Sequence, residues 1–381
     1  HGRNTAPAIT LAALSIEEDA LMLVMPSDHY ISSPEEFNLS IKSAIPIANS
    51  GKLVTFGVPP KSPHTGYGYI KSGDSIDDAF KIDKFTEKPS LESAKGFLKE
   101  GSYFWNSGIF LFKKSVFLRE MQNFRADILE FCERSMKEKT EKSNYISPDA
   151  KSFAECPSES IDYAIMEHTL ESAVVPLSGD WNDLGSWKSL LEVSEKDDHN
   201  NLIDGDVVIH DTRDCYLHSE DRLLVTNGIS NLVVVSTKDS LLVSDMNSTE
   251  NIKLIIEDIK KESRKEAEIH REVRRPWGSY DSIDSGEGFQ VKRITVKPRG
   301  LLSLQKHQFR SEHWTVVSGQ AKVTIGDEIF TLDVNESTYI PAQEIHRLEN
   351  ICDEDLVIIE VQIGSYTGED DIIRIEDVYG R

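Results

Sequence analysis

The chain has 381 residues, 39% of them hydrophobic, which is typical of a globular protein with two or three domains. Its formal net charge of −23 argues against a nucleic-acid partner, which needs a basic face, but small phosphorylated substrates need only a local basic pocket. The four cysteines form no CxxC pair, and no apolar run approaches the roughly 18–20 residues of a membrane span, so we expect a cytoplasmic protein that has no disulfides and does not enter a membrane.

Residues 1–200 alternate between strand-like and helix-like segments, which favours an α/β domain built on a mixed sheet. Apolar residues at helical spacing begin at Ile9, and the apolar run 21–25 predicts a buried strand. Ser33 as N-cap and Pro34 at the first helical position predict the start of a helix. We expect further strands at 52–58, 82–86 and 103–112, and further helices at 91–100 and 115–137.

The remaining chain divides into two β-rich parts. In residues 201–272, short β runs separated by Asp, Asn, Gly and Ser predict a short β-solenoid-like segment, followed by a connecting helix within 250–272. In residues 273–381, short strands recur with turn signals such as Gly300 and Gly319, which suits a small β-barrel or jelly roll.

Four polar residues of the last segment form a candidate metal site: Gln305, His307, Glu312 and His346. Imidazole nitrogens, a carboxylate and an amide oxygen suit Zn²⁺ or a similar divalent ion, and such a set leaves coordination positions open for catalysis. Gln305 and His307 are two residues apart, so both point to the same face of a strand. The alternative is that these are scattered surface residues, although unpaired polar groups inside apolar strands are costly.

The N-terminal half carries separate polar motifs. Asp28 follows a strand, at the position where α/β sheets bind ligands, and a second aspartate, Asp183, occupies a tight loop. The other candidates are Gly68 in Gly-Tyr-Gly-Tyr, the adjacent charges Glu87 and Lys88, and Asn106 beside Trp105. Alternatives stay open: the aspartates also suit helix caps or turns, and the charged pair also suits a solvated surface.

The segment from Arg275 to Arg381 resembles the isomerase domain of bacterial bifunctional mannose-1-phosphate guanylyltransferase/mannose-6-phosphate isomerases (type II). The matching strings are RPWGSYD, VKRITVKP, LSLQKH, EHWTVVSG, STYIP, HRLEN and GEDDIIR. The resemblance implies a cupin that interconverts mannose 6-phosphate and fructose 6-phosphate. It also implies that the four candidate donors bind Zn, Co or Mn, with Arg310 beside the metal. The base stays open among His313, Lys297 and Glu344. Family members usually carry a third consecutive histidine where this chain has Phe309.

The N-terminal motifs resemble, in order and spacing, the guanylyltransferase half of the same enzymes, a Rossmann-like sugar nucleotidyltransferase. The resemblance implies that Asp28 and Asp183 hold Mg²⁺, that Glu87 binds sugar hydroxyls and Lys88 the sugar phosphate, and that Gly68 and Asn106 line the sugar pocket. The substrates would be GTP and mannose 1-phosphate, and the product GDP-mannose. Because His1 to Pro7 matches the interior of that domain, we expect its Gly-rich phosphate loop to lie upstream and this chain to lack transferase activity.

Two alternatives to the bifunctional enzyme remain from the sequence. One is a chain in which only the isomerase is active. The other is a non-catalytic sugar- or nucleotide-binding protein whose cupin has lost its metal, and Phe309 favours this second alternative. Because cupin-like barrels often pair, we expect a homodimer.

Overall fold

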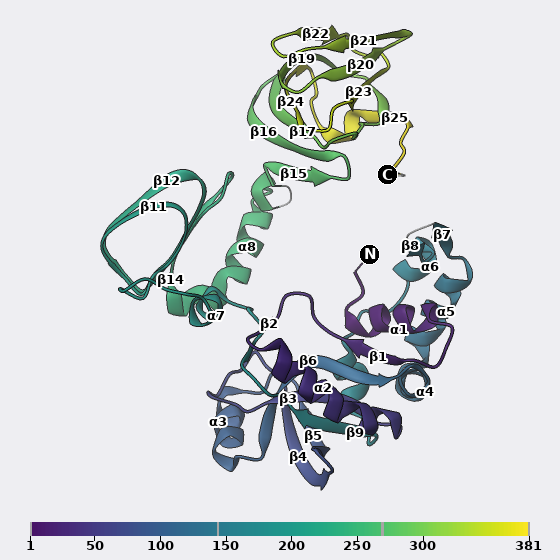
Figure 1. The fold of residues 1–381 in the computed structure, drawn as a ribbon, viewed down its shortest axis with the longest axis vertical. Coiled ribbons are helices and arrows are strands. Elements are labelled where there is room, and N and C mark those ends of the chain that lie inside the picture. Colours follow the sequence, from purple (N-terminus) through teal and green to yellow (C-terminus); the bar gives the residue numbers. More distant parts are fainter. Residues whose placement is uncertain (1, 143–144, 268–269, 380–381) are drawn as a thin grey trace. The chain divides into compact units, whose positions relative to one another are not determined.

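The computed structural model describes residues 2–142, 145–267 and 270–379, and the chain divides into two compact units, His1–Gly185 and Ser186–Arg381. The N-terminal unit is a sheet covered by helices, and the C-terminal unit contains a curved β segment, a helix and a β-barrel (Figure 1). Within the described residues, no helix combines the length and apolar character needed to cross a membrane.

The sheet of the N-terminal unit is mixed. Its strand order is β1 (Leu21–Val24), β6 (Tyr103–Lys113), β3 (Leu53–Val58), β9 (Ser172–Pro176), β5 (Ala79–Thr86) and β4 (Tyr69–Ile76). Strands β3 and β9 run parallel, whereas the other neighbours in this order are antiparallel. The mixed α/β sheet predicted from the alternating segments is therefore confirmed.

Helices cover both faces of this sheet. Alternate residues of a strand point to opposite faces, so Leu53 packs in one apolar core and Val54 in the other. The first core includes α1 (Thr5–Ser15), α4 (Lys114–Phe124) and α5 (Ala126–Lys137); the second includes α2 (Pro34–Asn49) and α3 (Leu91–Glu100). As predicted, Ser33 caps α2, and its hydroxyl accepts a hydrogen bond from the Glu36 N–H at 3.3 Å.

Shorter elements complete the N-terminal unit. They are β2 (Tyr30–Ile31) paired with β10 (Trp181–Asn182), β7 (Thr140–Lys142) paired with β8 (Tyr145–Ser147), α6 (Ala150–Ala154) and a π-helical turn at Asp162–Met166. Two predictions were wrong in detail. Within the run 21–25, Leu21–Val24 form an edge strand rather than a buried one, and Leu23 and the following Met25 are 39% and 46% exposed. The predicted helix 115–137 is two helices, because Arg125 leaves the helical conformation with φ −141° and ψ 55°.

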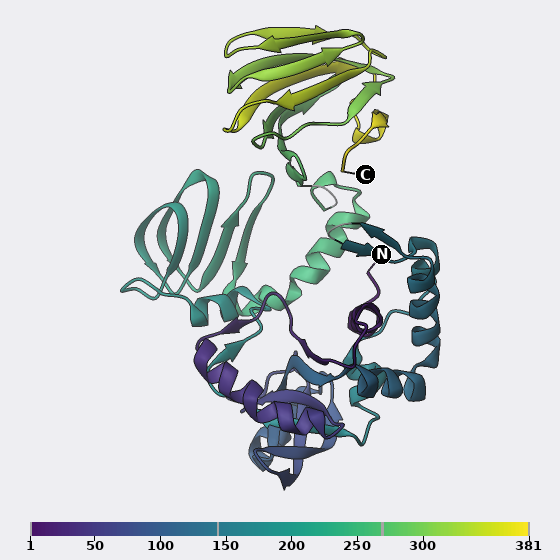
Figure 2. The same cartoon turned by 45° about the vertical axis from the view of Figure 1, so that its right-hand side comes forward.

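The C-terminal unit begins with α7 (Trp187–Val193) and a β-helical segment. Strands β11 (Leu202–Arg213), β12 (Tyr216–Ser230) and β13 (Leu232–Ser236) pair in parallel, and β14 (Leu241–Asp245) closes the sheet antiparallel. In Figure 2 the long strands β11 and β12 turn corners, as successive coils of a solenoid do. The 3₁₀ turns Met246–Asn251 and Lys265–Ala267 flank the connecting helix α8 (Ile252–Lys261), which is shorter than the predicted segment.

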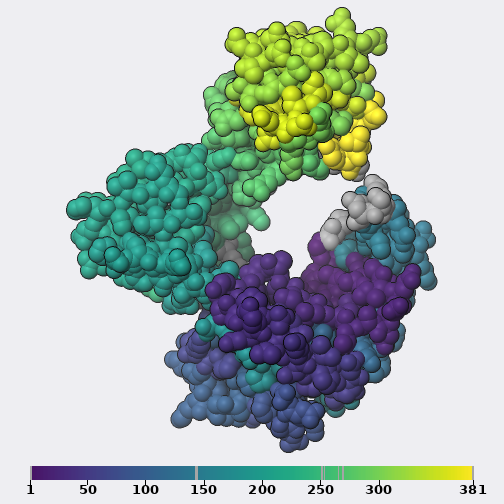
Figure 3. All heavy atoms as spheres, viewed as in Figure 1, coloured from purple at the N-terminus to yellow at the C-terminus, as the bar shows by residue number. Residues whose placement is uncertain are grey.

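The barrel consists of two facing sheets. One has the order β15 (Glu272–Arg275), β16 (Gly278–Gly286), β17 (Phe289–Val296), β24 (Leu356–Gly364), β19 (Arg310–Ser318) and β22 (Ser337–Ile340). The other has β21 (Glu328–Leu332), β20 (Ala321–Ile325), β23 (His346–Asn350), β18 (Leu304–His307) and β25 (Ile372–Glu376), with a 3₁₀ turn at Glu369–Asp371 before β25. Their apolar faces share one core around Trp314, Val323 and Ile358. In the space-filling view, side chains fill the gaps between the strands of the barrel's ribbon (Figure 3).

Candidate active sites

Three of the four predicted metal donors meet inside the barrel. His307 ends β18, Glu312 follows the start of β19, and His346 begins β23. Their ligand atoms all lie within 4.8 Å of one another, and each residue is at most 2% exposed. Between the first two strands, the N–H groups of Gln308 and Phe309 donate to the Asp371 carboxylate at 3.0 and 3.2 Å. This carboxylate therefore holds the turn that directs His307 and Glu312 into the same lumen.

The imidazole of His346 is oriented as a metal ligand would be. Its Nδ1 lies 2.9 Å from the Glu344 carbonyl oxygen, which can only accept, so Nδ1 carries the proton. Its Nε2 is buried without a hydrogen-bond partner and lies 3.6 Å from Glu312 Oε2. A free imidazole lone pair facing a carboxylate, with the other nitrogen held by a carbonyl, fits a divalent ion.

Glu312 is the most heavily hydrogen-bonded group of the cluster. It accepts from Arg310 Nε at 3.1 Å, Trp314 Nε1 at 3.1 Å and Gln362 Nε2 at 3.2 Å, and His307 Nε2 lies 3.0 Å away. Burial alone would raise the pKa of Glu312, but the hydrogen bond and charge of His307, followed by the charges of His346 and Arg310, hold it below its ordinary value. The carboxylate is therefore ionised and available to a cation.

The fourth predicted donor, Gln305, lies next to this cluster. It pairs across the strands with His346 and lines the same cavity as Glu312, where its Oε1 accepts from Ser303 Oγ at 2.8 Å. Arg310 is also part of the site, because its Nη1 donates to the Gly368 carbonyl at 2.8 Å while Nε holds Glu312. The structure thus brings the four predicted donors and Arg310 to one place.

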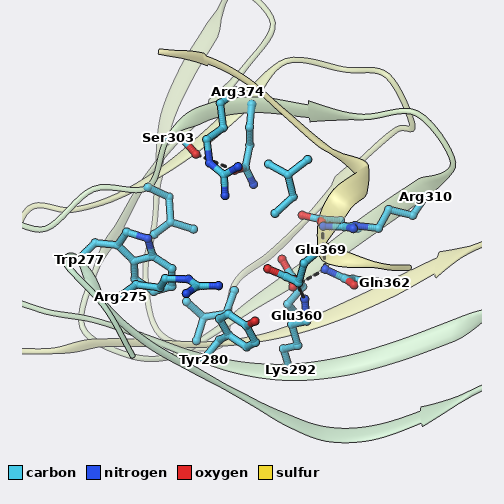
Figure 4. Close-up of a pocket in the computed structure, with 15 residues that line it drawn as sticks. Arg275, Trp277, Tyr280, Lys292, Ser303, Arg310, Glu360, Gln362, Glu369 and Arg374 are labelled. Atoms are coloured by element: carbon cyan, nitrogen blue, oxygen red, sulfur yellow. Dashed lines mark hydrogen bonds and ion pairs between the residues drawn. The ribbon is translucent and has the colours of Figure 1, made fainter. Parts of the chain in front are cut away.

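A cavity of about 50 Å³ lies beside the cluster (Figure 4). Two acidic residues that the sequence analysis missed line it, Glu360 and Glu369. Burial, followed by repulsion from Glu312, raises the pKa of Glu360 to about 8. Glu369 instead forms an ion pair with the buried amine of Lys292.

None of the three base candidates from the sequence is among the described residues that line this cavity. His313 and Lys297 are exposed, and Glu344 is half-buried. The choice of base among these three therefore finds no support in the geometry.

In the N-terminal unit, the pairing of β2 with β10 brings Asp28 and Asp183 toward the same place, since Asn182 lies opposite Tyr30. Burial lowers the pKa of His29, while the charges of both aspartates act to raise it, so both carboxylates lie within electrostatic reach of this ring. Asp183 Oδ1 accepts from the Tyr67 hydroxyl at 2.9 Å. The two aspartates can therefore supply hard oxygen ligands to one ion.

The other N-terminal candidates are also neighbours. A side chain on Gly68 would come within 2.5 Å of Glu87 Oε2 and 3.3 Å of Asn106 Cβ, so the missing side chain leaves the space that these groups occupy. Lys88 Nζ lies 3.4 Å from Glu87 Oε1 and remains 62% exposed. Asn106 Nδ2 donates to Asp162 Oδ1 at 2.9 Å, and burial raises the pKa of Asp162. The sequence analysis missed Asp162, which lies in the π-helical turn, a feature often found at functional sites.

Fold and sites together define an α/β nucleotidyltransferase unit joined through a short β-helix to a cupin with a buried His–Glu–His cluster. Family models agree over most of the chain: nucleotidyl transferase at residues 1–200, the mannose-phosphate isomerase/GMP-like beta-helix domain at 205–259, and the mannose-6-phosphate isomerase C-terminal domain at 262–377. The chain belongs to the family of mannose-1-phosphate guanylyltransferases that carry a C-terminal phosphomannose isomerase domain, as the sequence predicted.

Relatives of known name support this assignment. A mannose-1-phosphate guanylyltransferase of Escherichia coli is 48% identical over 390 residues, covering 100% of this chain and 82% of that protein. The xanthan biosynthesis protein XanB of Xanthomonas campestris pv. campestris is 49% identical over 383 residues, with the same coverage. Among solved structures, a Thermus thermophilus protein described as mannose-1-phosphate geranyltransferase matches with a TM-score of 0.61 and 28% identity, covering 68% of this chain and 76% of that one.

Proposed function

We propose that the cupin interconverts mannose 6-phosphate and fructose 6-phosphate, and that the N-terminal unit makes GDP-mannose from mannose 1-phosphate and GTP. The observation that supports the isomerase most directly is the buried cluster of His307, Glu312 and His346 at the wall of an open cavity. Within this cluster the buried Nε2 of His346 has no hydrogen-bond partner among the described residues, and a buried polar atom left unpaired is unfavourable unless it binds a ligand.

His307, Glu312, His346 and Gln305 would hold the divalent ion, for which Zn²⁺, Co²⁺ and Mn²⁺ all suit the donor set. When bound, such an ion supplies Lewis-acid polarisation of the sugar carbonyl. Arg310 keeps Glu312 ionised and places positive charge beside the oxygens on which negative charge develops. Glu360 is the cavity carboxyl suited to carry a proton between adjacent carbons, because its raised pKa lies near neutrality.

A coupled assay of fructose 6-phosphate formation, together with metal analysis of the purified protein, tests the isomerase. We expect one divalent ion per cupin and measurable turnover. His307→Ala should abolish both, whereas His210→Ala, an exposed histidine of the β-helical segment, should change neither. A stable protein that contains no metal and no isomerase activity would instead support the alternative of a non-catalytic binding cupin.

For the transferase, Asp28 and Asp183 would hold Mg²⁺ through carboxylate oxygens. Glu87 would accept hydrogen bonds from the sugar hydroxyls, Lys88 would neutralise the sugar phosphate, and the narrow space over Gly68 beside Asn106 would receive the sugar. The reaction is an in-line attack of mannose 1-phosphate on the α-phosphorus of GTP, in which positioning and charge neutralisation dominate catalysis.

GDP-mannose formation from radiolabelled mannose 1-phosphate measures this activity. Because we expect the chain to be inactive without the Gly-rich phosphate loop, the assay uses the chain with that loop restored upstream. Asp183→Asn should reduce turnover by a factor of about 100 or more, because a neutral amide is a poor Mg²⁺ ligand. Asp180→Asn is the matched control, since Asp180 is exposed and pairs with Lys61. Equal activity of the two variants would remove Asp183 from the metal site.

Two further parts of the proposal concern the whole protein. The substrates GTP and hexose phosphates belong to the cytoplasmic pool, and the described free cysteines suit a reducing compartment, so we place the enzyme in the cytoplasm. We also propose a homodimer, which light scattering coupled to size-exclusion chromatography tests; a mass of one chain at micromolar concentration would contradict it.

A further inference from the structure

Two arginines that line the cupin cavity form no ion pair with a carboxylate of the described residues. Four cationic side chains line the cavity, and two of them are already neutralised, Lys292 by Glu369 and Arg310 by Glu312. The other two are Arg275 at the end of β15 and Arg374 in β25, for which the described part of the chain shows no ion pair. Figure 4 shows both guanidinium groups directed into the cavity.

Uncompensated positive charge in such a place is a signal for an anionic ligand. The chain has a net charge of −23, yet among the described residues no carboxylate forms an ion pair with either arginine. Glu369 is near enough for the charge of Arg275 to act on it, but it already pairs with Lys292. Guanidinium groups match the oxygens of a phosphate in geometry and charge, and they are the usual choice for its recognition.

The surroundings of Arg275 keep it in position for such a ligand. Its guanidinium carbon lies 5.6 Å from the centre of the Tyr280 ring, a cation–π contact that orients the group without neutralising it. Burial, followed by the charge of Glu369, raises the pKa of Tyr280 to about 12, so its hydroxyl stays neutral beside Arg275.

The second arginine lies next to the predicted metal donors. Arg374 is the cross-strand neighbour of Gln305 in the pairing of β25 with β18, and residues in such register have Cβ atoms about 4.5–5.5 Å apart. The same cavity is also lined by Glu312 and Arg310. A ligand that reaches from the donor cluster to both arginines must therefore carry oxygen ligands at one end and an anion at the other.

We propose that Arg275 and Arg374 bind the phosphate group of a hexose 6-phosphate whose other end lies at His307, Glu312 and His346. This inference rests on the proposed isomerase function of the same cavity and adds to it the residues that select a phosphorylated sugar. The phosphate is a dianion near neutral pH, so the two guanidinium groups match its charge.

The test compares Arg275→Gln, Arg374→Gln and the double variant in the full chain. The matched control is Arg293→Gln, which removes the same charge from the exposed face of β17, next to Lys292. Steady-state kinetics with mannose 6-phosphate should show KM raised about tenfold to a hundredfold in each single variant, with kcat within about threefold of wild type, since one charge-assisted hydrogen-bonding group is lost. Arg293→Gln should leave both constants unchanged. Arg374→Lys should recover part of the loss.

Calorimetric binding gives a readout that does not depend on turnover. Mannose 6-phosphate and inorganic phosphate should both bind wild type, the sugar ester more tightly, and the double variant should weaken both by at least about tenfold. Unphosphorylated mannose should bind wild type and double variant equally weakly. If wild type does not isomerise but phosphate binding still depends on the two arginines, the proposed function fails and the phosphate site stands.

Two results would overturn the phosphate site itself. One is a double variant that isomerises mannose 6-phosphate with the KM of wild type. The other is inorganic phosphate that binds as tightly as mannose 6-phosphate, which would assign the arginines to free phosphate rather than to a sugar ester.

Discussion

Glu312 and Glu360 are two buried carboxyl groups in contact, and the structure predicts opposite responses when each is changed to glutamine. Hydrogen bonds and nearby positive charges hold the pKa of Glu312 below its ordinary value, whereas burial raises that of Glu360 to about 8. At pH 7 the first group is therefore charged and the second neutral. Glu312→Gln removes a charge, and Glu360→Gln replaces one neutral group by another of similar shape.

The expected loss of stability follows from the partners. Without the Glu312 carboxylate, the Arg310 guanidinium, 2% exposed, has lost its buried counter-ion, which costs about 3–5 kcal/mol. Around Glu360, the donors Trp314 Nε1 and Gln362 Nε2 also reach Glu312 at 3.1 and 3.2 Å, so neither is left unpaired in Glu360→Gln. That variant should lose less than about 1.5 kcal/mol.

Hydrogen exchange measured by mass spectrometry on the full chain, after chelator treatment at pH 7, reports the opening free energy of β19 and β24 separately from the N-terminal unit. We expect Glu312→Gln to lower this opening free energy by about 3–5 kcal/mol and Glu360→Gln by less than half as much. Equal losses in the two variants, or a larger loss for Glu360→Gln, would refute the assignment of charge to Glu312 alone.

Three other predictions concern separate features. Between pH 4.5 and about 8, Glu360 keeps a proton in the folded protein that it has released in the unfolded chain. The free energy of unfolding of the metal-free cupin should therefore fall as pH rises through this window, by up to about 1.4 kcal/mol per pH unit. Glu360→Gln should flatten this fall, and parallel pH profiles of wild type and variant would contradict the prediction. Gly278 has φ +151°, and an added Cβ would lie 1.9 Å from the Thr295 carbonyl oxygen. Gly278→Ala should therefore lower the free energy of unfolding of the barrel by about 3 kcal/mol or more in a denaturant titration. An unchanged midpoint would show that β16 and β17 can move apart. Burial raises the pKa of the Cys132 thiol, so Ellman's reagent should label the half-buried Cys352 in the native protein and reach Cys132 only after denaturation.

The sequence was sufficient to predict that Gln305 and His307 share one face of a strand, because their spacing obeys the strand period. Gln305 and His307 are two residues apart, and the turn after His307 is short enough that Glu312 must lie near the start of the next strand, which belongs to the facing sheet. The same reasoning did not identify Glu360 as a residue of the site. In β24 both faces carry apolar residues, so the alternation of Glu360 and Gln362 with Val361 does not say which face is the lumen.

The N-terminal sheet shows a second limit of local patterns. An apolar run such as 21–25 predicts a strand equally well whether one or both of its sides are paired, because pairing depends on segments elsewhere in the chain. The structure pairs β1 with β6 alone among the described strands, and Leu23 remains 39% exposed. The sequence pattern also did not predict that the helix ends at Arg125, because the apolar spacing of α4 and α5 continues across this residue.

Phe309 is the residue that favoured the non-catalytic alternative, and its position in the structure removes that support. It lies in the turn between β18 and β19, is 54% exposed, and packs edge-on against Tyr366 at 6.5 Å between ring centres. Its backbone N–H, rather than its side chain, serves the site by donating to Asp371. A phenylalanine directed outward takes no donor away from the lumen, where Gln305 lies opposite His346. The departure from the family pattern at this position therefore leaves the donor cluster intact, and the chain retains the residues that would hold a metal ion.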